Sequence, residues 1–318
     1  MSNTKFKIDF EDAICVTSDT DPSFKVYAYR IISTSTFHVT LMTPGGESTI
    51  EIRPGDRGGF ISKESNLSDK GTCWVLGTAC VIENAICRDN AVIGGDATIK
   101  GNAIVGDEAM VYGHAQVCDY SEIFESAMIS GWATIRDYSR IHGEAKIFGH
   151  ADVLGNAEIS GRARLLGEAC ATDASIVTGN AVISGGCVIL ERAYVCDALL
   201  YGDASIGGNA KIMENAQVGG NSVIIDNAIV MGNSQVNSAF VGANAIIAGE
   251  AILLEGAEIN EDVKIIEGVY PTEEVTDDAQ YFTYDESDLK EDEEDDEDDE
   301  DKDDDEELPS PECDPSSN

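Results

Sequence analysis

The sequence has 318 residues and a formal net charge of −40, because 60 acidic residues outnumber 20 lysines and arginines. Such an acidic surface repels nucleic-acid phosphates, which argues against direct DNA or RNA binding and favours a basic protein as a charged partner. The chain contains no run of the roughly 18 apolar residues that a membrane span needs, and its first ten residues lack the apolar core of a signal peptide. Nine scattered cysteines fit a reduced setting. We therefore expect a cytoplasmic protein that contacts neither nucleic acid nor membrane.

The first 64 residues are predicted to form a small β cap. Four segments enriched in Val, Ile, Tyr and Thr are expected to be short strands, at residues 5–10, 25–33, 36–42 and 48–52. Pro44, Gly45 and Gly46 give a turn signal between the last two. A cap at this place would cover the first strand edges of the repeat that follows, which would otherwise favour aggregation.

Residues 65–268 contain a six-residue repeat. An aliphatic residue follows two positions after most of the small residues, so the unit is A-x-[IV]-x-G-[N/D/E/H]. Two steps are five residues long, Ala193 to Ala198 and Ser234 to Ala239. The spacing does not fit the 3.6-residue period of a helix. The small residues include Ala79, Ala85, Ala91, Ala97, Ala103, Ala109 and Ala115, and the series continues to Ala257 and Val263.

This unit predicts an all-β fold, a single-stranded parallel β-helix. Side chains alternate along a strand, so the small and aliphatic residues point inward together and the residue between them points outward. A bend must follow within three residues, and Gly and Asn are expected to supply it because they adopt positive φ at little cost. The sequence contains 33 repeats, which at three to a coil predict about 11 coils.

The end of the chain has a different composition. Residues 269–284 are predicted to be a linker or capping segment. Residues 285–318 begin with an acidic run and end in prolines, a composition typical of disorder. This tail is interpreted either as a solvating segment or as a docking segment for a basic partner.

The outward positions of every third repeat predict an apolar stripe on one face. A contiguous apolar stripe on an acidic repeat protein indicates an interface, here for self-association. The alternative is a set of scattered exposed apolar residues of no significance. The predicted interface comprises Trp74, Val92, Met110, Met128, Val182 and Leu199, with Tyr112, Phe148, Leu166 and Tyr201 along the neighbouring edge.

Three histidines are weak candidates for a catalytic base. His114 and His150 lie 36 residues apart with Trp132 midway, so all three are expected to stack on one corner, whereas His142 falls on another corner. Two coils separate His114 from His150, a distance of about 10 Å, which is too far for one zinc ion. The favoured interpretation of each histidine is an ordinary surface turn residue.

No metal site is predicted from the cysteines. Cys73, Cys80 and Cys87 recur at seven-residue spacing, one more than the repeat. Cys73 and Cys87 should therefore point inward and Cys80 outward, so their thiols do not converge.

The hexads resemble those of the trimeric LpxA-like, hexapeptide-repeat superfamily, in which an aliphatic residue is followed four positions later by a small one, as Val105 is by Ala109. A lead-in comprising Tyr29-Arg30-Ile31, Gly55–Phe60, Asn66-Leu67-Ser68 and Cys73-Trp74-Val75 is similar to that of a bacterial and phage group. Proteins of that group are called polymer-forming or acyltransferase-like, with no settled activity. The resemblance implies a left-handed helix, a homotrimer and, where catalytic, an acyltransferase that uses acetyl-CoA or another acyl-CoA. The hexads from Ala79 to Ala193 run without the expelled loop that the superfamily's enzymes usually carry beside their histidine.

Three functional hypotheses follow. The first is a non-catalytic, self-associating β-helical scaffold or binding module that needs no cofactor. The second is an acyl-CoA-dependent acyltransferase acting on a small amine or hydroxyl. The third is an acidic, DNA-mimic-like inhibitor that occupies a basic or DNA-binding protein. Loop-free coils and few histidines favour the first.

Overall fold

The computed structural model describes residues 4–17, 25–43, 46–270 and 282–283. The predicted acidic tail, most of the predicted linker, and Pro44 and Gly45 of the predicted turn lie outside the described residues. The described chain is all-β, and its one helical element is the short 3-10 helix η1 (Glu64–Asn66). The predicted fold class, a left-handed parallel β-helix preceded by N-terminal β-strands, is confirmed.

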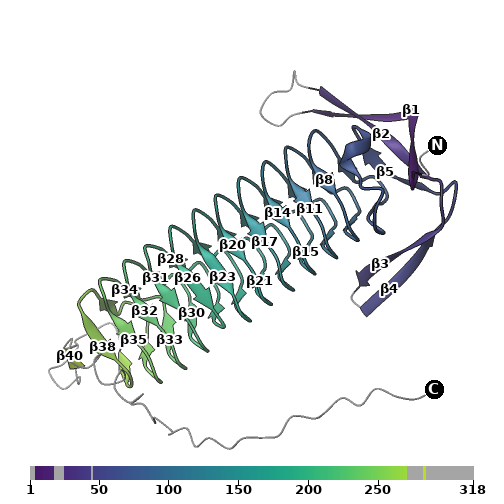
Figure 1. Cartoon of the computed structure of the whole chain (residues 1–318). Coiled ribbons are helices and arrows are strands. Elements are labelled where there is room, and N and C mark those ends of the chain that lie inside the picture. The colour runs from purple at the N-terminus through teal and green to yellow at the C-terminus, as the bar shows by residue number, and fades with distance from the viewer. Residues whose placement is uncertain (1–3, 18–24, 44–45, 271–281, 284–318) are drawn as a thin grey trace, which may run out of the picture. The chain divides into compact units, whose positions relative to one another are not determined.

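Each coil contributes one short strand to each of three parallel sheets, and the coils stack on one another (Figure 1). The strands of the first sheet within the helix run from β5 (Arg57–Ile61) through β7 (Cys80–Val81) to β37 (Glu258–Ile259). The second sheet runs from β8 (Ile86–Cys87) to β38 (Val263–Ile265), where β40 (Phe282–Thr283) adds an antiparallel strand. The third sheet carries the surface of interest. Its strands are β6 (Trp74–Val75), β9 (Val92–Ile93), β12 (Met110–Val111), β15 (Met128–Ile129), β18 (Lys146–Ile147), β21 (Arg164–Leu165), β24 (Val182–Ile183), β27 (Leu199–Leu200), β30 (Gln217–Gly219), β33 (Gln235–Asn237), β36 (Ile252–Leu253) and β39 (Val269–Tyr270).

The helix is slightly longer than the repeat count predicted. The third sheet has 12 strands, so the helix has about twelve turns and not eleven. One additional turn begins before the first counted repeat, where β5 pairs in parallel with β7 and Leu67 bridges to Cys87. At the other end β39 pairs with β36 beyond the last counted repeat.

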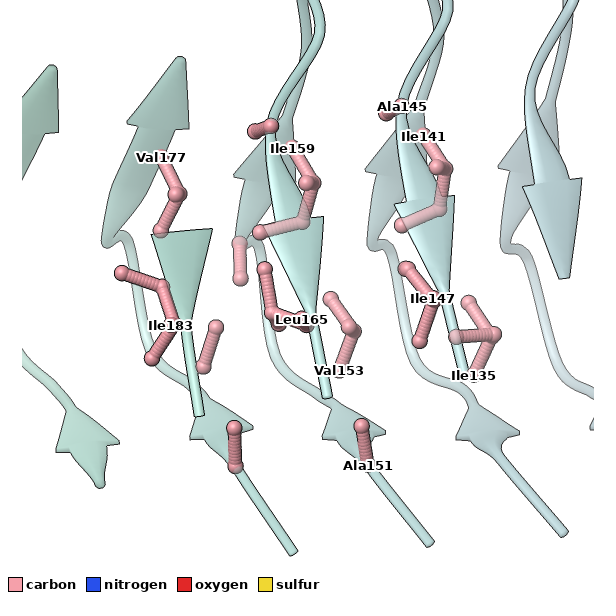
Figure 2. Packing of buried hydrophobic residues seen from close by; sticks show 14 of the residues in the cluster. Ile135, Ile141, Ala145, Ile147, Ala151, Val153, Ile159, Leu165, Val177 and Ile183 are labelled. Carbon is pink, nitrogen blue, oxygen red and sulfur yellow. The ribbon is translucent and has the colours of Figure 1, made fainter. Parts of the chain in front are cut away.

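The interior is filled as the alternation predicted. Side chains such as Ile135, Ile147 and Leu165 point from different strands into the space that they share, as Figure 2 shows, and each is fully buried. The small residues, Ala151 among them, are also fully buried and leave room for these aliphatic groups. Burying one aliphatic side chain contributes roughly 1.5–3 kcal/mol before the loss of chain entropy is counted.

The prediction that asparagine supplies the bends is wrong. No described asparagine has positive φ, and the left-handed turn residue is in most turns Gly or an acidic residue, such as Gly113 (φ 69°) or Asp107 (φ 52°). The asparagines follow the turn residue and stack on the asparagines of the next coil. Asn209 donates a side-chain hydrogen bond to Asn227 (3.0 Å), and Asn227 donates one to Asn244 (3.0 Å).

The acidic turn residues bind the backbone of the adjacent coil. Glu125 Oε2 accepts a hydrogen bond from the backbone N–H of Gly143 (2.7 Å), and Asp137 Oδ2 accepts one from Gly155 (2.9 Å). Asp226 makes the same contact with the N–H of Ala243 at 3.0 Å. These residues occur at two of the three corners. The third corner, which follows the strands of the third sheet, uses glycine at most positions, including Gly95, Gly113, Gly131 and Gly149.

The two five-residue steps are accommodated by shorter turns. At these steps Asp197 (φ 54°) and Ser238 (φ 52°) hold the left-handed position and are followed directly by the inward alanines. The strands on both sides remain in register, so Val182 pairs with Leu199 and Val223 pairs with Phe240.

Two of the strands predicted in the first 64 residues extend the first sheet. Strand β1 (Phe6–Thr17) pairs with β2 (Lys25–Ser33), and β2 pairs antiparallel with β5. Arg30 fixes this arrangement, because its guanidinium group lies 4.0 Å from the centre of the Phe60 ring and donates to Asp12 at 2.5 Å. Burial of Ala28, Phe60, Cys80 and Ile82 between cap and helix closes the first coil.

A separate hairpin follows the cap. Strands β3 (Phe37–Thr43) and β4 (Gly46–Ile52) pair with each other and with no other described strand, and they lie beside the first coils in Figure 1. Phe37, Val39 and Ile52 point from this hairpin into the core of the helix end. The ring of Phe37 meets that of Trp74 edge-on, with 5.2 Å between centroids.

Candidate functional site

The hairpin covers the first part of the predicted apolar stripe. Trp74 and Val92 are fully buried and Met110 is 6% exposed, because Phe37, Val39 and Leu41 pack over the same region. These three members of the stripe therefore face the chain's own hairpin. The expectation that they form an exposed surface for another subunit is wrong.

Charged residues interrupt the stripe beyond the hairpin. Met128 is half-buried and pairs with Lys146, which in turn pairs with Arg164, so two cations occupy the middle of this face. Tyr112 and Phe148 are half-buried on the neighbouring edge. The ring of Tyr112 lies over Gly94, and burial raises the pKa of its hydroxyl to about 12.

A second apolar group follows these cations. Val182 and Leu199 are neighbours on the third sheet, and Leu166 and Tyr201 lie on the adjoining edge. Leu199 is 38% exposed and Tyr201 is 39% exposed, whereas Leu166 and Val182 are half-buried. We call these four residues the mid-helix patch. It contains the two members of the predicted interface, Leu199 and Tyr201, that expose more than a third of their surface.

A groove runs between the hairpin and the third sheet, with a cavity volume of about 520 Å³. This volume falls within the range of about 300–1,000 Å³ that is typical of ligand-binding clefts. Its floor is formed by Met110, Met128 and Lys146. One wall is the strand β3, with His38, Thr40 and Met42, and the other is the corner before the third sheet, with Asn90, Glu108 and Glu144.

Carboxylates dominate the charge of this groove. Glu47, from β4, and Glu108 are exposed and have no ion-pair partner among the described residues. Glu144 accepts a hydrogen bond from Arg162 (3.1 Å), and Lys146 supplies an ammonium group beyond Met128. The groove therefore combines an apolar floor of two methionines with an acidic rim.

The predicted stack of His114, Trp132 and His150 is confirmed. The rings of His114 and Trp132 are 4.0 Å apart and nearly parallel, and those of Trp132 and His150 are 6.2 Å apart. Trp132 lies at the corner that follows the third sheet and is 57% exposed. His114 Nδ1 lies 3.5 Å from Asp96 Oδ2.

His142 lies on a different corner, as predicted. Its Nε2 is 3.2 Å from Glu158 Oε1, in a shallow depression that also contains Phe124 and Arg140. A carboxylate next to an imidazole can fix the orientation of the ring. The structure thus places the three candidate histidines on two corners and does not bring them together.

The inward and outward directions predicted for three cysteines are confirmed. Cys73 and Cys87 are fully buried in the helix, whereas Cys80 points outward and is covered by the cap. The Nζ of Lys5 lies 3.3 Å from Cys73 Sγ and 2.9 Å from the Cys73 carbonyl oxygen. A hydrogen bond from Cys87 and the charge of Lys5 lower the pKa of Cys73 to about 7.

Sequence reasoning missed the groove, although a signal was present. In residues 37–42 the apolar residues Phe37, Val39 and Leu41 alternate with the groove residues His38, Thr40 and Met42. A two-stranded hairpin with one apolar face is not stable alone and needs a surface to cover. The nearest exposed apolar surface in the predicted helix was the stripe that begins at Trp74.

Among the described residues no group of three or more His, Cys, Asp or Glu side chains is placed to hold a metal ion. The described part of the chain also contains no helix with the length and apolar character to cross a bilayer. The fold defines the chain as a β-helical repeat protein. No protein-family model and no curated protein matches its sequence.

Proposed function

We propose that the protein is a non-catalytic, self-associating β-helical scaffold or binding module that requires no cofactor. The observation that carries this proposal is the unbroken stack of coils. From β6 to β38 consecutive strands in the described chain are joined by short turns, and none of these turns is enlarged into a loop beside a histidine. The exposed surface of the helix consists of short strands and corners, which suits the binding of another macromolecule.

The mid-helix patch supports self-association. Leu199 and Tyr201 each expose more than a third of their surface, next to the partly exposed Leu166 and Val182. Apolar side chains that gather on an otherwise acidic surface are typical of an interface. We propose a homo-oligomer, with a trimer as the favoured state, that uses this patch.

The experiment compares the full chain with the double variant Leu199→Glu/Tyr201→Glu. Light scattering coupled to size-exclusion chromatography should show an oligomer for the wild type and a monomer for the variant. Gln217→Glu is the matched control, because Gln217 is exposed and occupies the next outward position after Leu199 on the same sheet. A wild-type chain that is monomeric at high micromolar concentration would overturn the self-association part of the proposal.

One observation favours the acyltransferase alternative. The contact between His142 and Glu158 at 3.2 Å is of the kind that prepares an imidazole to act as a general base. If the protein uses an acyl-CoA, millimolar acetyl-CoA should raise the melting temperature of the wild type, and His142→Gln should abolish acyl transfer. Absence of any thermal stabilisation would count against this alternative.

A further inference from the structure

We propose that the groove between β3 and the third sheet binds an extended, basic peptide segment of a partner protein, which adds to β3 as a third strand. The inference deepens the proposed function, since it specifies what a binding module of this kind would bind. It uses the hairpin and the first coils, and does not involve the mid-helix patch.

The backbone of β3 offers an unpaired strand edge to the groove. In an antiparallel pair, successive residues direct their N–H and C=O groups alternately toward the partner strand and away from it. The N–H of Met42 points away from β4, because it donates to Met110 Sδ at 3.3 Å. The same alternation directs the backbone groups of His38 and Thr40 away from β4. Within the described residues β3 has β4 as its sole paired neighbour.

The position of this edge suits an added strand. The inner face of the hairpin already packs on the third sheet through Phe37, Val39 and Leu41. A strand placed beside His38 and Thr40 would extend the same two-stranded sheet across the floor of the groove, where Met128 remains half-exposed. Strand addition of this type obtains affinity from main-chain hydrogen bonds and selectivity from alternate side chains.

Charge and polarity determine the class of peptide. Every second side chain of the added strand would face Met110 and Met128, which favours apolar residues at these positions. The intervening side chains would pass between Glu47 and Glu108, whose carboxylates have no ion-pair partner among the described residues. Lysine or arginine fits there, and the net charge of −40 would attract such a segment from a distance.

The test uses the full chain and a fluorescein-labelled octapeptide that alternates lysine and valine, with binding measured by fluorescence anisotropy at physiological salt. Thr40→Pro removes an N–H from the groove edge without removing a bond to β4. Thr49→Pro is the matched control, because Thr49 pairs with Thr40 and directs its N–H toward the opposite edge of the hairpin. We expect Thr40→Pro to weaken binding at least ten-fold and Thr49→Pro to leave it within two-fold.

A second arm keeps the test informative if proline disturbs the hairpin. A peptide of the same sequence, N-methylated at every residue, keeps its charge but has no main-chain N–H to donate on either edge of a strand. It should bind the wild type at least ten-fold more weakly than the unmodified peptide. Equal binding of the two peptides would show that charge alone attracts them, through the acidic tail or surface, and would overturn the proposal. No measurable binding of the unmodified peptide would also overturn it, and would leave the oligomer experiment unaffected.

Discussion

The carboxylate of Asp107 accepts a hydrogen bond of 3.0 Å from the backbone N–H of Glu125, the equivalent residue one coil further along the helix. Glu125 makes the same contact with Gly143. Part of the acidity of the chain thus has a structural origin, because acidic turn residues hold adjacent coils together at two corners. The hypothesis of a DNA-mimic-like inhibitor rested on the acidity of the chain. Because these carboxylates have a structural role, the acidity supports that hypothesis less strongly.

The hydrogen bonds of the acidic turn residues predict that two substitutions of Asp137 change the free energy of unfolding by different amounts. This residue has φ 66°, and its side chain accepts the N–H of Gly155 at 2.9 Å. Asp137→Asn keeps an acceptor oxygen and tolerance of positive φ, so it should change the free energy of unfolding little. Asp137→Ala loses both and should cost about 1–2 kcal/mol. Urea denaturation measures both values, and equal stability of the two variants would refute a role for the side-chain oxygen.

The glycines at the corner that follows the third sheet predict that two Gly→Ala substitutions destabilise the protein by different amounts. A Cβ on Gly131 (φ 80°) would lie 2.6 Å from the carbonyl oxygen of Gly149, whereas one on Gly77 (φ 64°) would come no closer than 3.4 Å to Gly95. Gly77→Ala should cost about 1 kcal/mol from positive φ alone. Gly131→Ala adds a steric clash and should cost roughly 1–3 kcal/mol more. The thermal midpoints of the two variants, measured side by side, check the order.

The contact between Phe37 and Trp74 predicts how hairpin docking can be observed. Trp74 is fully buried, whereas Trp132, the other tryptophan, is exposed and is best replaced by phenylalanine for this experiment. In that background Phe37→Ala should loosen the hairpin, shift the emission of Trp74 to longer wavelength and increase its quenching by acrylamide. Phe10→Ala is the control, because Phe10 is 70% exposed and contacts Tyr29 on the cap. An unchanged spectrum for Phe37→Ala would show that the hairpin does not shield Trp74.

The thiol of Cys73 predicts a pH-dependent stability. Its pKa is lowered from 9.0 to about 7, chiefly by a hydrogen bond from Cys87 and by the charge of Lys5. A group whose pKa is lowered by folding stabilises the folded state fully above its unfolded pKa, and this contribution is lost as the pH falls through the folded pKa. The free energy of unfolding should therefore rise between about pH 7 and pH 9. The pKa of Cys87 is raised, so its thiol stays protonated in this window.

The matched variant for this prediction is Cys73→Ser, which does not titrate in the window and should show a flatter stability profile. Cys187→Ser serves as the control, because burial raises the pKa of Cys187 and its replacement should leave the slope unchanged. Chemical denaturation at pH 6.5, 7.5 and 8.5 distinguishes the profiles. Parallel profiles for wild type and Cys73→Ser would exclude the thiolate.

The helix could be predicted from the sequence because the same pattern of inward small and aliphatic residues recurs along the repeat. Ala151 and Ile147 are inward for the reason that Ala109 and Val105 are, so a single local pattern determines the core of all coils. The corner stack of His114 and Trp132 followed from the same register. The error over asparagine has a local cause. Where an asparagine follows the turn residue, both residues tolerate positive φ. The six-residue period alone does not say which of the two adopts it.

The site was harder to predict because it depends on contacts distant in sequence. Residues 37–43 and 46–52 cover a face that begins at Trp74, and no periodic signal connects these residues with that face. The outward positions were therefore interpreted as exposed when Trp74 and Val92 are buried. Lys146 and Arg164 were visible in the sequence, and their positions on the same face already indicated that the stripe is not continuous.

Because the strands of successive coils pair in register, the length of the helix can be changed by whole coils. Equivalent residues are 18 positions apart, as Thr134 and Asp152 are, or 17 where a short turn intervenes, as for Val188 and Ser205. Duplicating one such stretch between Lys146 and Leu166 would lengthen the helix while every other side chain kept its direction. The distance between the groove and the mid-helix patch can thus be changed in increments of one coil, by editing the gene and without redesigning either surface.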